Sequence, residues 1–123
     1  MNVVVNNGIT YINTTPHSIK LRNTAGEDFI VEPSGIKLNA AVVEEKITGH
    51  SKVELVQAKF KGTEEGNNIL AEIFKTHGDA VVIGSIIAAQ AYPGAVLGMI
   101  AVPGLERVPA EQKVMRADKF TVF

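Results

Sequence analysis

The chain has 123 residues, of which 46% are apolar and 20% are charged, and its formal net charge at pH 7 is −1. This length and composition predict one globular domain with a single core. The balanced charge argues against generic nucleic-acid binding, which needs a basic face, and the absence of Cys excludes disulfides, thiolate metal sites and cysteine nucleophiles. The first 13 residues contain no Lys or Arg and no long apolar run, so we expect no signal peptide and a cytoplasmic protein.

Short runs rich in β-branched residues dominate the first third of the chain. Residues 3–5 and 9–12 flank an Asn-Asn-Gly turn and predict a small hairpin. Residues 18–31 alternate apolar and charged positions on both sides of a Thr-Ala-Gly-Glu turn, which predicts a second hairpin. Alternation resumes over residues 36–43, so we expect another strand there.

The middle of the chain contains the clearest helix signal. Residues 44–51 are polar and are expected to form a loop, and residues 52–60 predict a strand that is partly buried on both faces. A helix is predicted at about residues 64–77, with Thr63 as the N-cap, two glutamates at its positive end and Gly78 just past its end. The helix carries one apolar stripe at helical spacing, which consists of Ile69, Leu70, Ile73 and Phe74.

An uncharged run at residues 80–105 is the most apolar part of the chain. Its length would suffice to cross a bilayer, but polar residues and a Pro-Gly break interrupt it, so we expect no membrane span. The run divides into a buried strand at 80–83, a short Ala-rich helix at about 86–92 and a second buried strand at 96–102. The following residues, 106–123, are the most basic segment.

These patterns predict an α+β fold for residues 1–123. We expect a single compact domain with a mostly antiparallel or mixed sheet, one main amphipathic helix at about 64–77 and a short helix at about 86–92.

No established catalytic motif is present, although Ser85 follows a predicted strand and a glycine in a way that resembles a nucleophile elbow. No local pattern selects His17, His50 or His77 as its base. The alternative role of Ser85 is the N-cap of the short helix. We therefore predict no catalytic residue, no metal site and no cofactor, favour a non-enzymatic protein, and keep a small hydrolase that uses Ser85 as a third hypothesis.

The start of the short helix predicts a small anion site. Ser85 and the neighbouring backbone N–H groups would hold a phosphate or carboxylate, and Arg107 and Arg116 would supply counter-charges. The alternative is that both arginines are solvated or pair with nearby carboxylates, which are those of Glu106, Glu111 and Asp118.

Three further polar side chains are candidates for ligand contacts. Gln90 and Tyr92 have polar tips in apolar surroundings, so each is expected either to hold a neighbouring backbone group or to contact a ligand. For Gln90 we favour the structural role. His17 follows Pro16 in a rigid loop, and the alternative to ligand binding is an edge loop with local Asn and Thr hydrogen bonds.

Several stretches together resemble a known group. They are Asn13-Thr14-Thr15-Pro16-His17, Glu32-Pro33-Ser34-Gly35, the segment 84–94, Glu106-Arg107-Val108-Pro109 and the segment 115–121. The chain resembles small proteins of tailed phages and some bacteria whose N-termini contain N-(L/T)-T-P-H and for which no activity is established. The usual Pro-Pro-x-Glu-Lys pattern after Glu-Arg-Val is absent here. The resemblance implies a phage origin and action inside an infected bacterium.

Two functions are then expected. The first is a small phage-encoded binding protein in the host cytoplasm, a homo-oligomer that sequesters a phosphate-bearing, nucleotide-type signal or blocks a host defence factor. Its ligand-binding residues would be Ser85, Gln90, Tyr92, Arg107, Arg116 and His17. The alternative is a virion or assembly protein that uses residues 80–105 as a subunit interface.

Overall fold

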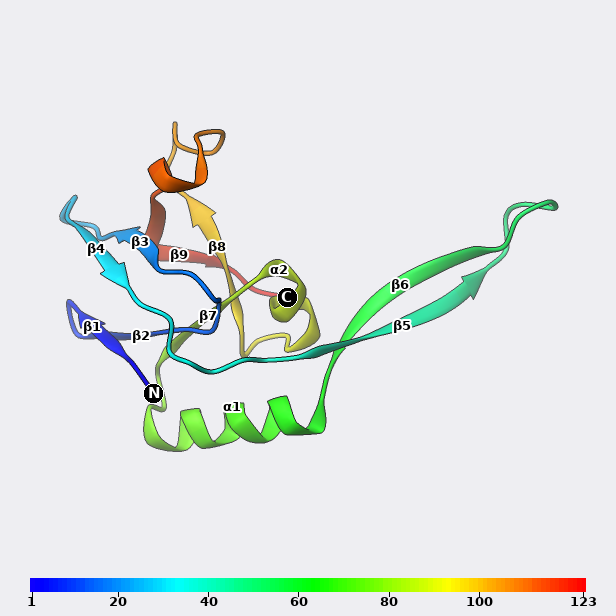
Figure 1. Cartoon of the computed structure of the whole chain (residues 1–123), viewed down its shortest axis with the longest axis horizontal. Helices are drawn as coiled ribbons and strands as arrows, with labels where there is room; N and C mark the ends of the chain where they lie inside the picture. Colours follow the sequence, from blue (N-terminus) through cyan, green and yellow to red (C-terminus); the bar gives the residue numbers. More distant parts are fainter.

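The computed structural model describes all 123 residues and contains nine strands, two α-helices and one 3-10 turn (Figure 1). In chain order they are β1 (Val4–Asn6), β2 (Ile9–Asn13), β3 (Ile19–Arg22), β4 (Asp28–Val31), β5 (Ala40–Ile47), β6 (Leu55–Gly62), α1 (Glu64–Thr76), β7 (Val81–Gly84), α2 (Ile86–Ala91), β8 (Leu97–Ala101), the 3-10 turn at Ala110–Gln112 and β9 (Met115–Thr121). The predicted α+β class, the mixed sheet and the main helix are confirmed.

Seven strands form one mixed sheet in the order β1-β2-β7-β8-β9-β3-β4. The hairpins β1–β2 and β3–β4 are antiparallel, as predicted, whereas β7 runs parallel to both β2 and β8. After β4 the chain returns to β2 through a parallel bridge between Asn13 and Pro33. The two ends of the sheet are therefore brought together, and the sheet curls around its inner face.

Hydrogen bonds of Asn13 stabilise this contact between β2 and the chain that follows β4. Its side-chain amide donates to the carbonyl of Val31 at 3.1 Å and to that of His17 at 2.7 Å, and its Oδ1 accepts from the backbone N–H of Thr15 at 2.9 Å. The hydroxyl of Ser34 donates to the Asn13 carbonyl at 2.7 Å. Asn13 and Ser34 are the two buried polar residues, and these bonds satisfy their polar groups.

The inner face of the curled sheet encloses a small core. It is formed by Tyr11, Leu21, Val31, Ile83 and Ala117. The Tyr11 ring lies 5.4 Å from that of Phe29, and its hydroxyl crosses the interior to donate to the carbonyl of Ala117 at 2.8 Å. Burial raises the pKa of this phenol, with a smaller contribution from the negative charge of Asp118, so the hydroxyl stays protonated and can donate.

A second core lies on the outer face of β2 and β7, where both helices pack. α1 contributes Leu70 and Ile73 to this core, and α2 contributes Ala88, Ala89 and Ala91. Thr63 caps α1, since its hydroxyl accepts from the N–H of Gly66 at 3.0 Å. The helix has the predicted start and ends at Thr76, one residue before the predicted end.

The uncharged run 80–105 forms β7, α2 and β8, close to the predicted division into strand, short helix and strand. β7 and β8 each have a neighbour on both sides within the large sheet. Neither helix of the protein has the length and apolar composition needed to cross a bilayer.

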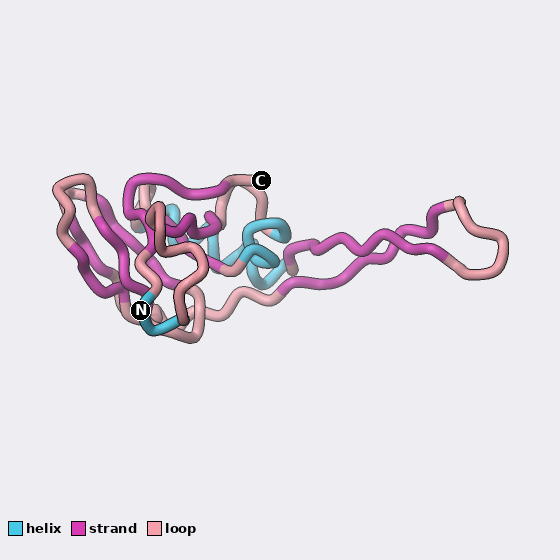
Figure 2. Tube along the Cα trace, turned by 90° about the horizontal axis from the view of Figure 1, so that it is seen from above, coloured by secondary structure: helices cyan, strands magenta, loops and turns pink.

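β5 and β6 form a two-stranded ribbon that projects away from the body (Figures 1 and 2). Residues 44–51, predicted as a loop, instead continue β5 to Ile47, and the turn comes at residues 48–54. The predicted burial of 52–60 on both faces is also wrong, because only Phe60 in that segment is even partly buried. We call residues 40–62 the arm.

Candidate functional site

Ser85 is the N-cap of α2, and its Oγ accepts from the N–H of Ala88 at 3.1 Å. This confirms the structural alternative considered for this serine. α2 has six residues and no charged side chain in its first or last turn. The helix therefore provides only a weak dipole for an anion at Ser85.

Tyr92 is a structural residue that ties the base of the arm to the body. Its side chain is 2% exposed, and its hydroxyl donates to the carbonyl of Asn39 and accepts from the N–H of Thr63 at 3.0 Å. Gly62 passes so close to the ring that a Cβ there would overlap it, and a Cβ on Gly66 would overlap the hydroxyl. This burial leaves no surface for a ligand, so we replace the predicted ligand contact of Tyr92 by a structural role.

Gln90 is exposed, in contrast to the expectation of a buried amide that holds a backbone group. α2 turns its alanines inward and leaves Gln90 beside the arm, where it lines a shallow hollow of about 290 Å³ together with Ala58, Lys59 and Phe60. Gln90 therefore faces the junction between the arm and the body.

The two predicted counter-charges do not converge on Ser85. Arg107 is exposed and forms no ion pair. Arg116 donates from Nε and Nη2 to the Asp118 carboxylate at 3.0 and 2.9 Å, which confirms the alternative of local pairing. Ser85 directly follows β7, and the register across β8 places the end of β7 level with Thr121, the last residue of β9. Arg116 lies five residues before Thr121, which is roughly 15 Å further along the sheet.

Arg116 has a matching neighbour in Arg22, its register partner on the parallel strand β3. Arg22 donates from Nε to Asp28 at 2.7 Å and from Nη2 at 3.1 Å. These hydrogen bonds lower the pKa of both carboxyl groups, Asp28 and Asp118. A hollow of about 160 Å³ lies between the two arginines and the loop after β8, where Val102 and Pro103 line it.

His17 is exposed, and its backbone carbonyl accepts from the side chains of Asn13 and Thr15 at 2.7 and 3.0 Å. This is the pattern of local hydrogen bonds considered as the alternative for this loop.

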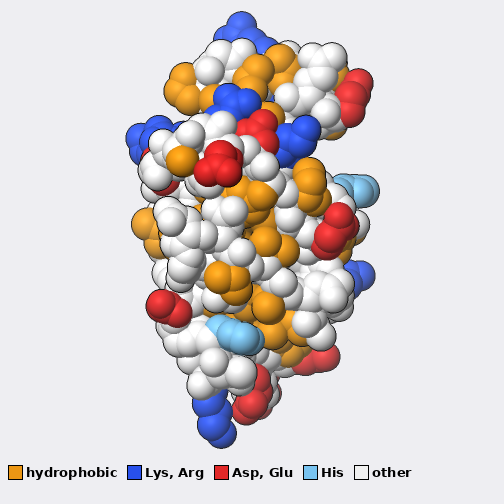
Figure 3. All heavy atoms as spheres, turned by 90° about the vertical axis from the view of Figure 1, so that its left-hand side faces the viewer, with side chains coloured by type: hydrophobic (Ala, Val, Ile, Leu, Met, Phe, Trp, Pro, Cys, Tyr) orange, Lys and Arg blue, Asp and Glu red, His pale blue; other side chains and the backbone are white.

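On the face of the body away from the arm, basic and acidic side chains lie next to one another (Figure 3). No three His, Asp or Glu side chains lie close enough together to hold a metal ion.

The feature that the sequence did not reveal is the apolar surface of the arm. Five large apolar side chains on it are at least 36% exposed, and they are Val42, Ile47, Val53, Leu55 and Val56. Beside its base, α2 exposes Ile86 and Ile87, and the C-terminus exposes Val122 and Phe123. The register places Val42 and Val56 on one face of the ribbon and Ile47 and Leu55 on the other, so apolar side chains are exposed on both faces of the arm, and a partner that covers them would remove apolar surface from water.

The tip of the arm has a defined shape and charge. The His50 imidazole Nδ1 accepts from the N–H groups of Lys52 and Val53 at 3.0 and 3.2 Å, which closes the turn. Along the ribbon, Lys59 pairs with Glu45 of the facing strand and Lys46 pairs with Glu54 at the end of the turn. Lys52, Lys61 and Glu44 form no ion pair, so the arm carries two unpaired positive charges and one unpaired negative charge beside its apolar side chains.

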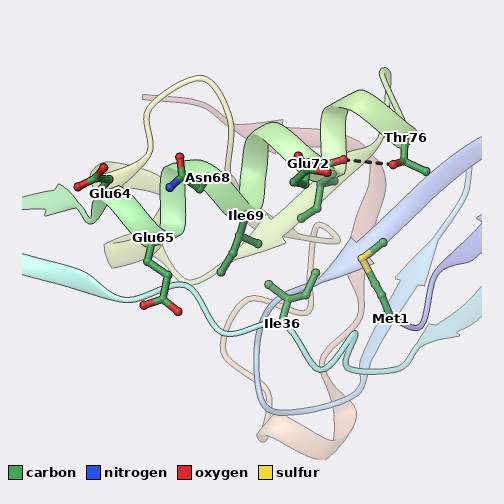
Figure 4. A pocket seen from close by; sticks show the side chains of 9 residues that line it. Met1, Ile36, Glu64, Glu65, Asn68, Ile69, Glu72 and Thr76 are labelled. Atoms are coloured by element: carbon green, nitrogen blue, oxygen red, sulfur yellow. Dashed lines mark hydrogen bonds between the residues drawn. The ribbon is translucent and has the colours of Figure 1, made fainter.

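A groove of about 720 Å³ runs along α1 and is the largest hollow of the molecule (Figure 4). Its apolar lining consists of Met1, Ile36, Ile69 and Ile73, and its polar rim consists of Glu64, Glu65, Asn68, Glu72 and Thr76. In Figure 4, the Ile69 side chain points towards Ile36, Met1 lies beyond Ile36, and Glu65 lies at the edge of the groove. The rim contains three carboxylates and no basic residue. We call this feature the α1 groove.

Comparison of the chain with protein-family models, with curated proteins and with solved structures finds no match.

Proposed function

We propose that the protein is a non-enzymatic assembly protein whose subunits associate through the arm. The observation that carries this proposal is that both faces of a long two-stranded ribbon are exposed while five of its large apolar side chains face water. The resemblance to a phage group, which remains a prediction, would place the assembly in the cytoplasm of an infected bacterium or in the virion.

The stability of an isolated ribbon supports a partner for the arm. Two strands without a third strand or a helix against them are marginally stable in water, yet β5 and β6 pair over eight residues each. Only the base of the arm, near Ala40 and Phe60, packs on the core of the body. Covering the exposed half of each apolar side chain would contribute roughly 1 kcal/mol per residue, enough to hold the outer arm in place.

The proposed interface differs from the one expected from sequence. The alternative hypothesis of a virion or assembly protein placed the subunit interface at the uncharged run 80–105, but most of this run forms β7 and β8 inside the sheet and the buried side of α2. The large apolar side chains of that run that remain exposed are those of Ile86 and Ile87 on α2, the helix that packs against β6. An interface centred on the arm would include them at its edge.

A shortened arm tests the proposal. Val43 and Lys59 are register partners, so residues 44–58 can be replaced by an Asn-Gly turn that keeps the packed base of the ribbon. In sedimentation experiments we expect the intact chain to be oligomeric and the shortened chain to be monomeric with the same helix content by circular dichroism. An equal oligomeric state for the two chains would contradict the role of the arm.

A second candidate function is the binding of a small phosphate-bearing ligand, and the pairing of Arg22 with Arg116 on neighbouring strands favours it. Two guanidinium groups at adjacent register positions suit bidentate contacts to phosphate oxygens. The ligand would have to displace the two aspartates. Isothermal titration with ATP and with inorganic phosphate tests this function, and binding that survives the double substitution Arg22→Ala/Arg116→Ala would exclude this site.

A further inference from the structure

We propose that the arm of one subunit docks in the α1 groove of a second copy of the chain, and that the exchange is reciprocal. This inference rests on the proposed self-association and names the surface that receives the arm. Three properties identify the arm as the occupant of the α1 groove: its charge, its exposed apolar side chains and its length.

Charge complementarity favours the arm as the occupant of the α1 groove. The rim carries Glu64, Glu65 and Glu72 and no basic side chain. The arm carries two lysines without carboxylate partners, Lys52 and Lys61, against one unpaired carboxylate, that of Glu44. Two copies of the groove facing each other would instead bring like charges together, which is unfavourable. The groove therefore fits a partner surface that combines apolar side chains with lysines.

The apolar surfaces also match. Near the tip of the arm, Ile47 and Leu55 are register partners, and Val53 lies two residues before Leu55. All three are exposed. The α1 groove offers an isoleucine-rich lining that would cover them. Because His50 closes the turn through two backbone hydrogen bonds, the tip would bind with little loss of conformational entropy.

The dimensions permit a two-fold exchange. Eight residues of strand give the arm a length of about 26 Å, and the 13 residues of α1 give the groove a length of about 20 Å. α1 begins directly after the arm, so the groove starts near the base of the arm and runs along the body in the opposite direction (Figure 1). A biological interface needs roughly 1,000 Å² of buried surface in total, so each of the two reciprocal contacts would have to supply about half of it. In such an isologous dimer each contact occurs twice.

Disulfide trapping tests the docking directly, because the chain contains no Cys of its own. One preparation carries Val53→Cys at the tip of the arm, and a second, differently tagged preparation carries Asn68→Cys on the rim of the groove. Both positions are exposed, so the substitutions leave the fold intact. As a matched control, Lys20→Cys places the thiol at an exposed position on β3, outside the groove.

After mixing and mild oxidation, we expect a covalent heterodimer of the Val53→Cys and Asn68→Cys chains, at least tenfold more abundant than that of the Val53→Cys and Lys20→Cys chains. Homodimers of Val53→Cys alone would indicate tip-to-tip contact, and homodimers of Asn68→Cys alone would indicate groove-to-groove contact. Either result, or an oligomer without any of these disulfides, would overturn the docking but leave the proposed self-association intact. A monomeric intact chain would overturn both.

Charge reversal provides a second readout. The double substitution Glu65→Lys/Glu72→Lys is expected to raise the dissociation constant of the oligomer at least tenfold, and Lys52→Glu in the same chain is expected to restore part of the affinity. The control double substitution Glu106→Lys/Glu111→Lys changes the net charge equally at exposed positions outside the groove. An equal loss of affinity in the control would show that net charge alone acts, and would overturn the proposed role of the rim.

Discussion

The substitution Tyr92→Phe tests whether a single hydroxyl holds the base of the arm. In the native protein this oxygen donates to the Asn39 carbonyl just before β5 and accepts from the N–H of Thr63 just before α1. A third contact of the Tyr92 oxygen, with the Thr63 hydroxyl, lies at 3.3 Å. Removing the oxygen keeps the buried ring but leaves two partly buried backbone groups without their partner.

The expected loss of unfolding free energy is about 2 kcal/mol, because each unsatisfied backbone group costs about 1–3 kcal/mol and water reaches these two in part. The matched control is Tyr11→Phe, which removes one hydrogen bond, to the Ala117 carbonyl. This control is expected to cost about 1 kcal/mol. The difference between the two variants measures the second bond made by Tyr92.

Unfolding in urea, monitored by circular dichroism, measures both losses. An unchanged dependence of the unfolding free energy on urea concentration would show that the surface exposed on unfolding is the same. Hydrogen exchange adds a local readout, since the Thr63 amide should exchange faster in Tyr92→Phe and at the native rate in Tyr11→Phe. A loss below about 0.5 kcal/mol with native exchange at Thr63 would refute the role assigned to the hydroxyl.

Three other predictions follow from single contacts and charges. Gly66→Ala should destabilise the protein in urea titrations although alanine favours helices, because the new Cβ overlaps the tyrosine hydroxyl; the neighbouring exposed control Asn67→Ala should be neutral or stabilising. Ser85→Ala should cost about 1 kcal/mol through loss of the α2 cap, and an unchanged midpoint would contradict that role. The lowered pKa values of Asp28 and Asp118 contribute stability above the unfolded value of about 3.9, which is lost as the pH falls through their folded values. In thermal melts between pH 5 and pH 2, Asp28→Asn/Asp118→Asn should therefore lose less stability than the native chain, and equal slopes would contradict the pairing.

Local signals in the sequence predicted most of the body. The turn residues identified both hairpins, and Thr63 with the apolar stripe of α1 identified the main helix. The division of the run 80–105 also followed from local residues, because Ser85 and the Pro-Gly pair after Tyr92 mark the ends of α2. These features depend on interactions within a few residues, which a single sequence shows directly.

The arm could not be predicted in the same way, because a ribbon with water on both faces needs no alternation of polar and apolar residues. Its charged residues 44–46 resemble a loop, and they form a strand because they face a partner strand after a turn. The ion pair of Glu45 with Lys59 spans the ribbon. Such pairs depend on register, which local sequence does not specify here.

The candidate site was predicted in its parts but not in its arrangement. The pairing of Arg116 with Asp118 was one of the expected alternatives, since residues two apart lie on the same face of a strand. That Gln90 is exposed and Tyr92 is buried depends on which side of α2 meets the sheet, a tertiary choice. The burial of Asn13 was missed because two of its four hydrogen-bonded neighbours, Val31 and Ser34, reach it only when the sheet closes.

The molar mass of the intact chain in solution tests the central claim most directly. Sedimentation equilibrium between low micromolar and several hundred micromolar concentrations would measure it without labels. If the arm is covered by a second copy, the mass should be twice the chain mass of 13.2 kDa, or a higher multiple, and should fall towards that of one chain on dilution or with the shortened arm. A mass of one chain at every concentration would contradict the account.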